Sequence, residues 1–141
     1  MYPTLLKLGW NVALESTLVV SIVNEALFNF SVNVSEVMPD ATRGMVQTRM
    51  LGCQGVGVRG VRFAVDKPDS ALRSWYIADG LPRFDVTETN AVGAGGLFNV
   101  PEGRSVVTAR RASDDMLVAR SEVPIRRGFM TVVVFAPLAI E

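Results

Sequence analysis

Histidine is absent from this chain of 141 residues, and cysteine occurs once. Without imidazole there is no Ser-His-Asp or Cys-His catalysis and no zinc site built on histidine, and one cysteine does not replace those ligands. The charges balance, with 14 Lys and Arg against 14 Asp and Glu, so no net field draws the chain to nucleic acid or to an anionic membrane. These features predict a domain that is not an enzyme and that holds no cofactor.

The chain also lacks a long uninterrupted apolar run. The longest apolar stretch near the start, residues 14–30, is interrupted by Glu15, Asn24, Glu25 and Asn29. Such a stretch neither spans a bilayer nor serves as the apolar region of a signal peptide, so we expect no transmembrane segment. Two interpretations stay open, a cytosolic protein and a mature chain whose leader has been removed.

Apolar residues and turn formers dominate what is present. Hydrophobic residues make up 49% of the chain, with 12 Gly and 7 Pro, which is enough to bury a core and excludes disorder. Valine is concentrated in short runs separated by Gly, Pro, Asn and Asp, a pattern typical of strands joined by turns. Apolar and polar residues alternate or form short apolar runs that predict strands at residues 44–51, 60–66, 73–77, 84–89, 97–100, 105–110, 117–123 and 129–136.

These segments predict an all-β domain. Because short connections leave no room for crossover helices, we expect an antiparallel β-sandwich of seven or eight strands over residues 44–141. Pro124 marks a sheet edge or a bend, because proline donates no hydrogen bond to a neighbouring strand. The nearly unbroken apolar run at 129–136 predicts a strand at the centre of a sheet.

The first 43 residues differ in their residue pattern from the strand-rich remainder, and they predict an extension that packs on the sandwich. One strand is expected at residues 18–23. One short helix is expected to follow, with Ser21 or Asn24 as its N-cap and its end near Val32. A piece of this size seldom forms a core of its own, so residues 1–43 are not expected to fold alone.

A glycine motif follows the first strand of the sandwich. Gly55, Gly57 and Gly60 have the spacing of the dinucleotide-binding fingerprint. That fingerprint requires a helix after the third glycine, whereas residues 61–66 alternate as a strand. We therefore interpret the motif as a hairpin whose glycines adopt positive φ.

Carboxylates on successive loops suggest a weak candidate for a calcium site. Asp66, Asp69 and Asp79 lie in predicted turns, and Asp114 and Asp115 form a further acidic turn. Calcium prefers oxygen ligands, but no EF-hand spacing is present. Aspartate is also favoured in turns without any metal, so solvated turn carboxylates are the simpler interpretation.

Trp75 and Tyr76 are the candidates for binding a ligand, since aromatic rings stack on sugars. Neighbouring residues of a strand point to opposite faces, so one ring is expected outside and the other in the core. Cys53 has no partner for a disulfide within the chain, and we expect a small buried thiol at the end of a strand.

Arginine is concentrated in the last third of the chain. Without interleaved aromatic residues for base stacking, a basic face built from these arginines does not predict nucleic-acid binding. Outward arginines on strands more often prevent pairing between sheet edges. The residues concerned are Arg104, Arg110, Arg111, Arg120, Arg126 and Arg127.

Three runs carry a resemblance to a known family: Gly60-Val61 at the start of a strand, residues 87–93, and residues 96–103 with a proline and a glycine at their end. The chain resembles the carboxypeptidase regulatory-like domain, which has the prealbumin-like (transthyretin-like) β-sandwich fold, over residues 44–136. It is also similar to a variant in bacterial secreted or lipid-anchored proteins of unassigned role. That likeness rests on Cys53 and on residues 74–82, 98–103 and 125–131.

The resemblance implies an accessory module without shared catalytic residues, in an extracellular or cell-envelope setting. The chain departs from the family pattern at Glu102, where a second proline or a small residue is usual. Enzymes on related sandwiches depend on histidines, which this chain lacks.

Three functional hypotheses follow from the sequence. The first is a non-catalytic structural or interaction module of a bacterial envelope or secreted protein, with a protein or glycan as its unknown partner. The second is a carbohydrate- or calcium-binding module. The third is a structural subunit that assembles with copies of itself through edge strands.

Overall fold

The computed structural model describes residues 5–8, 15–22 and 40–137, and these residues form strands and no helix. A seven-stranded sheet has the order β1-β2-β10-β3-β7-β5-β6, and a three-stranded sheet has the order β4-β8-β9. The strands are β1 (Leu5–Leu8), β2 (Glu15–Ile22), β3 (Arg43–Met50), β4 (Val61–Val65), β5 (Arg73–Ala78), β6 (Leu81–Arg83), β7 (Ala94–Pro101), β8 (Gly103–Arg111), β9 (Leu117–Ile125) and β10 (Met130–Pro137).

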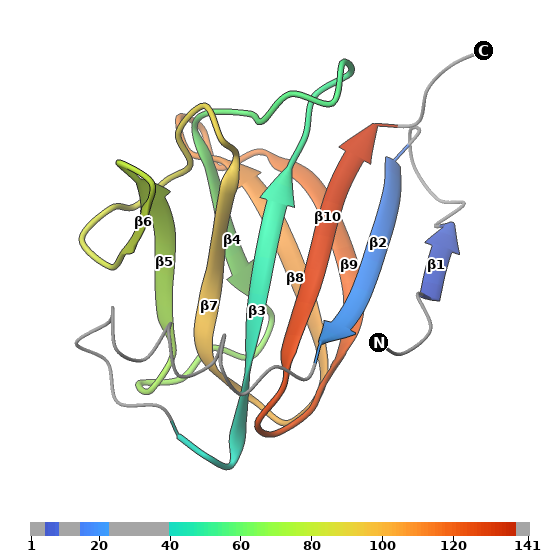
Figure 1. Cartoon of the computed structure of the whole chain (residues 1–141), viewed down its shortest axis with the longest axis vertical. Coiled ribbons are helices and arrows are strands. Elements are labelled where there is room, and N and C mark those ends of the chain that lie inside the picture. The colour runs from blue at the N-terminus through green and yellow to red at the C-terminus, as the bar shows by residue number, and fades with distance from the viewer. Residues whose placement is uncertain (1–4, 9–14, 23–39, 138–141) are drawn as a thin grey trace.

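The two sheets lie face to face and share a core, and Figure 1 shows β4, β8 and β9 behind the larger sheet. Alternation decides which side chains enter the core. On β4 the odd-numbered residues are buried and the even-numbered ones are exposed. On β8 the odd-numbered residues Val107 and Ala109 are likewise buried. Phe63 of β4 stacks on Tyr76 of β5 and on Phe135 of β10, at ring-centre distances of 6.0 and 6.5 Å. One aromatic cluster therefore joins the two sheets.

Most of the predicted strands are confirmed, and β3 to β10 give the expected eight strands. The exception is 84–89, which the sequence predicts as a strand. The strand that follows β5 is instead β6, which pairs with β5 through a turn of two residues, Asp79-Gly80. Pro82 of β6 lies at the edge of the sheet. Phe84 and Val86 are half-buried between exposed neighbours, so the segment has a strand's burial pattern without a ladder of hydrogen bonds.

The expectation of a wholly antiparallel sandwich is wrong at one pair. β10 lies between β2 and β3, antiparallel to β2 and parallel to β3, with Met130 opposite Met45. The central position predicted for 129–136 is confirmed. Val133 and Phe135 are fully buried there. An interior position gives an apolar strand hydrogen-bonding partners along both edges. Parallel pairing is only slightly less stable per residue than antiparallel pairing, so the parallel direction on one side costs little by comparison.

Two glycines of β7 make room for two aromatic side chains. Gly95 lies opposite Tyr76 and Gly96 opposite Trp75 in the pairing of β7 with β5. A Cβ on Gly95 would lie 2.6 Å from the Tyr76 ring, and a Cβ on Gly96 would lie 2.5 Å from the Trp75 ring. The sequence predicts a bend at 93–96, but these two glycines lie inside a strand because each aromatic ring packs across one of them.

The N-terminal extension adds strands to the larger sheet. The strand predicted at 18–23 corresponds to β2, and β1 is a second strand, paired antiparallel with β2. Ser21 lies within β2, and the remainder of the predicted helix falls outside the described residues. Within the described residues, no helix is long and apolar enough to cross a membrane.

Candidate functional site

A cleft of about 450 Å³ opens between the edge strand β4 and the strands β5 and β8. Its volume lies within the range of about 300–1,000 Å³ typical of small-molecule sites. Its floor is built from core residues, and its walls carry cationic and hydroxyl side chains. The lining residues are Arg62, Phe63, Ala64, Ser74, Tyr76, Thr87, Arg110 and Asp115.

Two arginines stand directly opposite each other on the outer face of the small sheet. Arg62 of β4 and Arg110 of β8 are paired across the strands. The guanidinium of Arg62 has no hydrogen-bond or ion-pair partner among the described residues, although its main chain is paired with β8. Arg110 Nη1 donates to the main-chain oxygen of Asp115 at 3.0 Å and lies 4.0 Å from its carboxylate. Like charges directly opposite each other in a sheet repel, so this pair attracts an anion.

Tyr76 forms part of the floor of the cleft. It is 2% exposed, and its hydroxyl accepts a hydrogen bond from the Phe63 main-chain N–H at 3.0 Å. This bond satisfies a donor on the edge of β4 that no strand of the described ranges covers. Burial raises the pKa of the Tyr76 hydroxyl above its usual value of 10, and the hydrogen bond from Phe63 opposes that shift in part.

Replacement of Tyr76 by phenylalanine is expected to change how stability depends on pH. In the folded wild type the hydroxyl keeps its proton above pH 10, while in the unfolded chain it loses that proton. The free energy of unfolding therefore falls as pH rises above 10, and this part of the fall is absent in Tyr76→Phe. At neutral pH the variant is less stable by about 1–3 kcal/mol, because Phe63 N–H loses its acceptor.

Urea denaturation of wild type and Tyr76→Phe at pH 7, 9 and 11 measures both effects. Parallel losses of stability in the two proteins between pH 9 and 11 would contradict the assigned role of the hydroxyl.

Trp75 lies on the opposite face from Tyr76, as the alternation predicts, but it is not exposed. Only 7% of Trp75 is exposed, and it packs in a second apolar cluster with Met45, Phe98 and Met130, on the face of the larger sheet that points away from the small sheet. Its indole N–H has no hydrogen-bond partner in the described part of the chain. The expectation that one of the two rings stands outside for sugar stacking is wrong, because both faces of β5 are covered.

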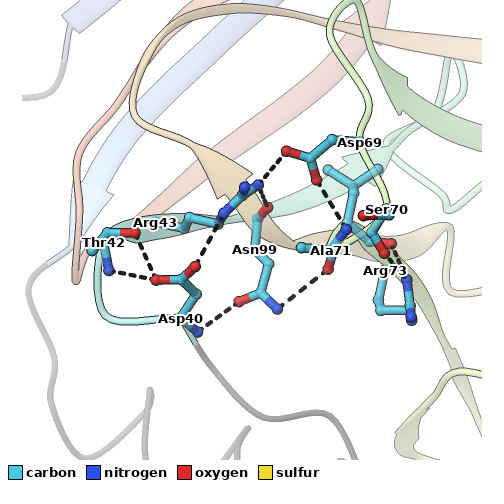
Figure 2. Close-up of polar contacts among 9 residues, drawn as sticks. Asp40, Thr42, Arg43, Asp69, Ser70, Ala71, Arg73 and Asn99 are labelled. Atoms are coloured by element: carbon cyan, nitrogen blue, oxygen red, sulfur yellow. Dashed lines mark hydrogen bonds and ion pairs between the residues drawn. The ribbon is translucent and has the colours of Figure 1, made fainter.

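Asp69 belongs to a polar network at the end of the molecule where β3 begins (Figure 2). Arg43 Nη1 donates to Asp69 Oδ2 at 2.7 Å and to the main-chain oxygen of Asn99 at 3.1 Å, and Arg43 Nε lies 3.2 Å from Asp40 Oδ2. Asn99 Oδ1 accepts the Asp40 N–H at 2.9 Å, and Ala71 N–H donates to Asp69 Oδ1 at 3.0 Å. Asn99 adopts a positive φ of 57°. Three separate segments are thereby tied together.

The charges of this network shift its pKa values in the directions that strengthen it. The hydrogen bond from Arg43 lowers the pKa of Asp69, and the same bond raises the pKa of Arg43. The hydrogen bond from Thr42 is the main cause that lowers the pKa of Asp40. The carboxylates therefore stay ionised when the pH falls slightly below the usual aspartate range.

The three aspartates proposed for calcium do not share one environment. Both oxygens of Asp69 are occupied as described. Asp66 accepts the Val106 N–H at 2.9 Å, and Asp79 lies in the β5–β6 turn with a positive φ of 53°. Among the described residues, no group of three or more His, Cys, Asp or Glu side chains is placed to hold a metal ion.

The glycine motif reverses the chain, as its sequence predicts. Gly55 and Gly60 have positive φ, whereas Gly57 does not. Leu51 and Gly57 form an antiparallel bridge, and β4 follows where a nucleotide-binding helix would begin. Cys53 lies in the turn of this loop and is exposed, so the expectation of a buried thiol is wrong. The thiol lies beyond the end of β3, in a turn closed by the Gly55 N–H to the Gly52 oxygen.

The arginines of the last third do not form one basic face. Arg104, Arg110 and Arg120 alternate outward on β8 and β9, and Arg104 pairs with Glu122. The other three lie at the end of a strand or in a turn. Arg111 ends β8 and pairs with Asp114 at 2.6 Å, Arg127 pairs with Glu102 at 3.1 Å, and Arg126 is exposed after β9. Arg62, which the sequence did not single out, joins Arg110 because β4 pairs with β8 across a long stretch of chain.

Comparisons of the chain with protein families, with curated proteins and with solved structures found no match.

Proposed function

We propose that the chain is a non-catalytic structural or interaction module, a β-sandwich of the carboxypeptidase regulatory-like kind, in a bacterial envelope or secreted protein. The observation that supports the proposal is that many charged side chains form ion pairs with one another. Several carboxylates are paired with arginines, as in Arg43 with Asp69, Arg83 with Asp85 and Arg111 with Asp114. Such pairs fix loops in place and leave little freedom for acid–base chemistry.

The polar network around Arg43 supports the same proposal. It joins the start of β3 to the loop before β5 and to Asn99 of β7 (Figure 2). An accessory module that spaces or presents other domains benefits from a fixed junction of this kind, because a fixed junction transmits orientation.

A turnover assay tests the proposal. The chain at high concentration is incubated with a panel of aryl esters and aryl glycosides, and we expect no saturable release of product. Saturable turnover that disappears in a variant of one carboxylate, such as Asp115→Asn or Glu88→Gln, would overturn it.

Glycan binding is a second candidate function, and the cleft between β4 and β5 is the observation that favours it. The cleft combines donors, acceptors and a rigid floor in one place. Calcium binding is less favoured, because Arg43 already neutralises Asp69. Assembly through edge strands remains a proposal for the small sheet, in which β9 is an edge strand, but the exposed Pro124 of β9 disfavours pairing because proline donates no hydrogen bond.

A further inference from the structure

We propose that the cleft binds a sugar acid, a polyhydroxylated ring that bears a carboxylate, with Arg62 and Arg110 holding the carboxylate. This inference rests on the second candidate function, glycan binding, and names its ligand class. It follows from the arginine pair, from the hydroxyl groups beside it and from the rigidity of the floor.

The arginine pair favours an anionic ligand. Arg62 and Arg110 lie opposite each other in the pairing of β4 with β8, and the Arg62 guanidinium has no hydrogen-bond or ion-pair partner among the described residues. The one acidic group that lines the cleft with them, Asp115, lies 4.0 Å from Arg110. A carboxylate between two guanidinium groups converts their mutual repulsion into two charge-assisted, geometrically matched contacts.

The other polar side chains of the cleft favour a ligand with hydroxyl groups. The side chains of Ser74 and Thr87 line the cleft, and neither hydroxyl has a hydrogen-bond partner among the described residues. The Asp115 carboxylate repels a second anion but accepts hydrogen bonds from neutral hydroxyls. A ligand that satisfies both sets of groups carries one carboxylate and several hydroxyls, which is the composition of a hexuronic acid.

The floor is preorganised. Phe63 and Tyr76 are 4% and 2% exposed, stack on each other and are linked by the bond from Phe63 N–H to the Tyr76 hydroxyl. Side chains fixed in this way do not have to be ordered when the ligand binds, so more of the interaction energy appears as affinity.

Isothermal titration calorimetry of the full chain tests the inference with three probes: D-glucuronate, D-glucose and acetate. We expect D-glucuronate to bind more tightly than either of the others, since only it carries both chemistries. In Arg62→Gln the affinity for D-glucuronate is expected to fall about tenfold or more, the loss typical of a charged hydrogen-bond partner. The matched control is Arg120→Gln, an exposed arginine on β9 outside the cleft, for which no change is expected.

Each alternative result would overturn the inference. Equal losses in Arg62→Gln and Arg120→Gln would indicate attraction to the sheet's overall charge. Equal binding of glucose and glucuronate would remove the role of the carboxylate while leaving glycan binding intact. Equal binding of acetate and glucuronate would remove the role of the sugar, and absence of binding by the wild type would reject the site. None of these results touches the non-catalytic function, which the turnover assay tests separately.

Discussion

A Gly96→Ala variant is expected to lose about 3 kcal/mol or more of its free energy of unfolding, because it adds a methyl group to a closed interior. The added Cβ would lie 2.2 Å from the main-chain oxygen of Val46 and 2.5 Å from the Trp75 ring. Neither neighbour moves freely: the oxygen belongs to the adjacent strand β3, and the ring is buried in an apolar cluster. Equilibrium denaturation in urea measures the loss.

Gly55→Ala is the matched control for this variant. Gly55 has a φ of 73°, but nothing lies within 4 Å of the position of its Cβ. Its cost is only that of left-handed backbone in an L-residue, about 1–2 kcal/mol. If the two variants lose the same stability, the close approach of β3, β5 and β7 around Gly96 is contradicted.

A Phe63→Ala variant is expected to lose about 3–5 kcal/mol, a large part of the stability of a domain of this size. Phe63 is 4% exposed and contacts aromatic rings of both β5 and β10, so its removal leaves a cavity between the sheets. Phe63→Leu keeps most of the volume, and its expected cost is about 1 kcal/mol. Both values come from urea denaturation monitored by circular dichroism.

The test is the difference in free energy of unfolding between Phe63→Ala and Phe63→Leu. A small, equal loss in both would mean that this ring does not join the two sheets. If Phe63→Ala does not fold, Phe63→Leu still reports on the core, because a loss well above 1–2 kcal/mol would show that the site does not tolerate an aliphatic side chain of similar volume.

Local patterns predicted the strands whose burial follows alternation. Residues 60–66 were placed correctly because alternate residues form one apolar face, which the core covers. Residues 44–51 were also placed correctly, although Met45 on the second face of that strand is buried as well. The same rule failed at 84–89, because alternation reports burial and not pairing. The main chain at Thr89 bonds to Val61 and Gly60, but no ladder extends along the segment.

Features that depend on contacts between distant segments were not predictable from local patterns. The roles of Gly95 and Gly96 depend on which residues of β5 lie opposite them, and the parallel pair of β3 and β10 depends on the order of strands in the finished sheet. For the candidate site, Tyr76 was identified, but its position in the core and its bond to Phe63 were not. Arg62, Ser74 and Thr87 come from three separate segments, so no spacing in the sequence marked them as neighbours.

Amide correlation spectra of the isotopically labelled chain, recorded during titration with D-glucuronate, test the central claim most directly: this sandwich binds at the β4–β5 cleft without transforming what it binds. The predicted result is a set of saturable shifts at residues 62–64, 74, 76, 87, 110 and 115, with the resonances of the sugar unchanged over days. Shifts confined to other surfaces, or the appearance of resonances from a new sugar product, would contradict it.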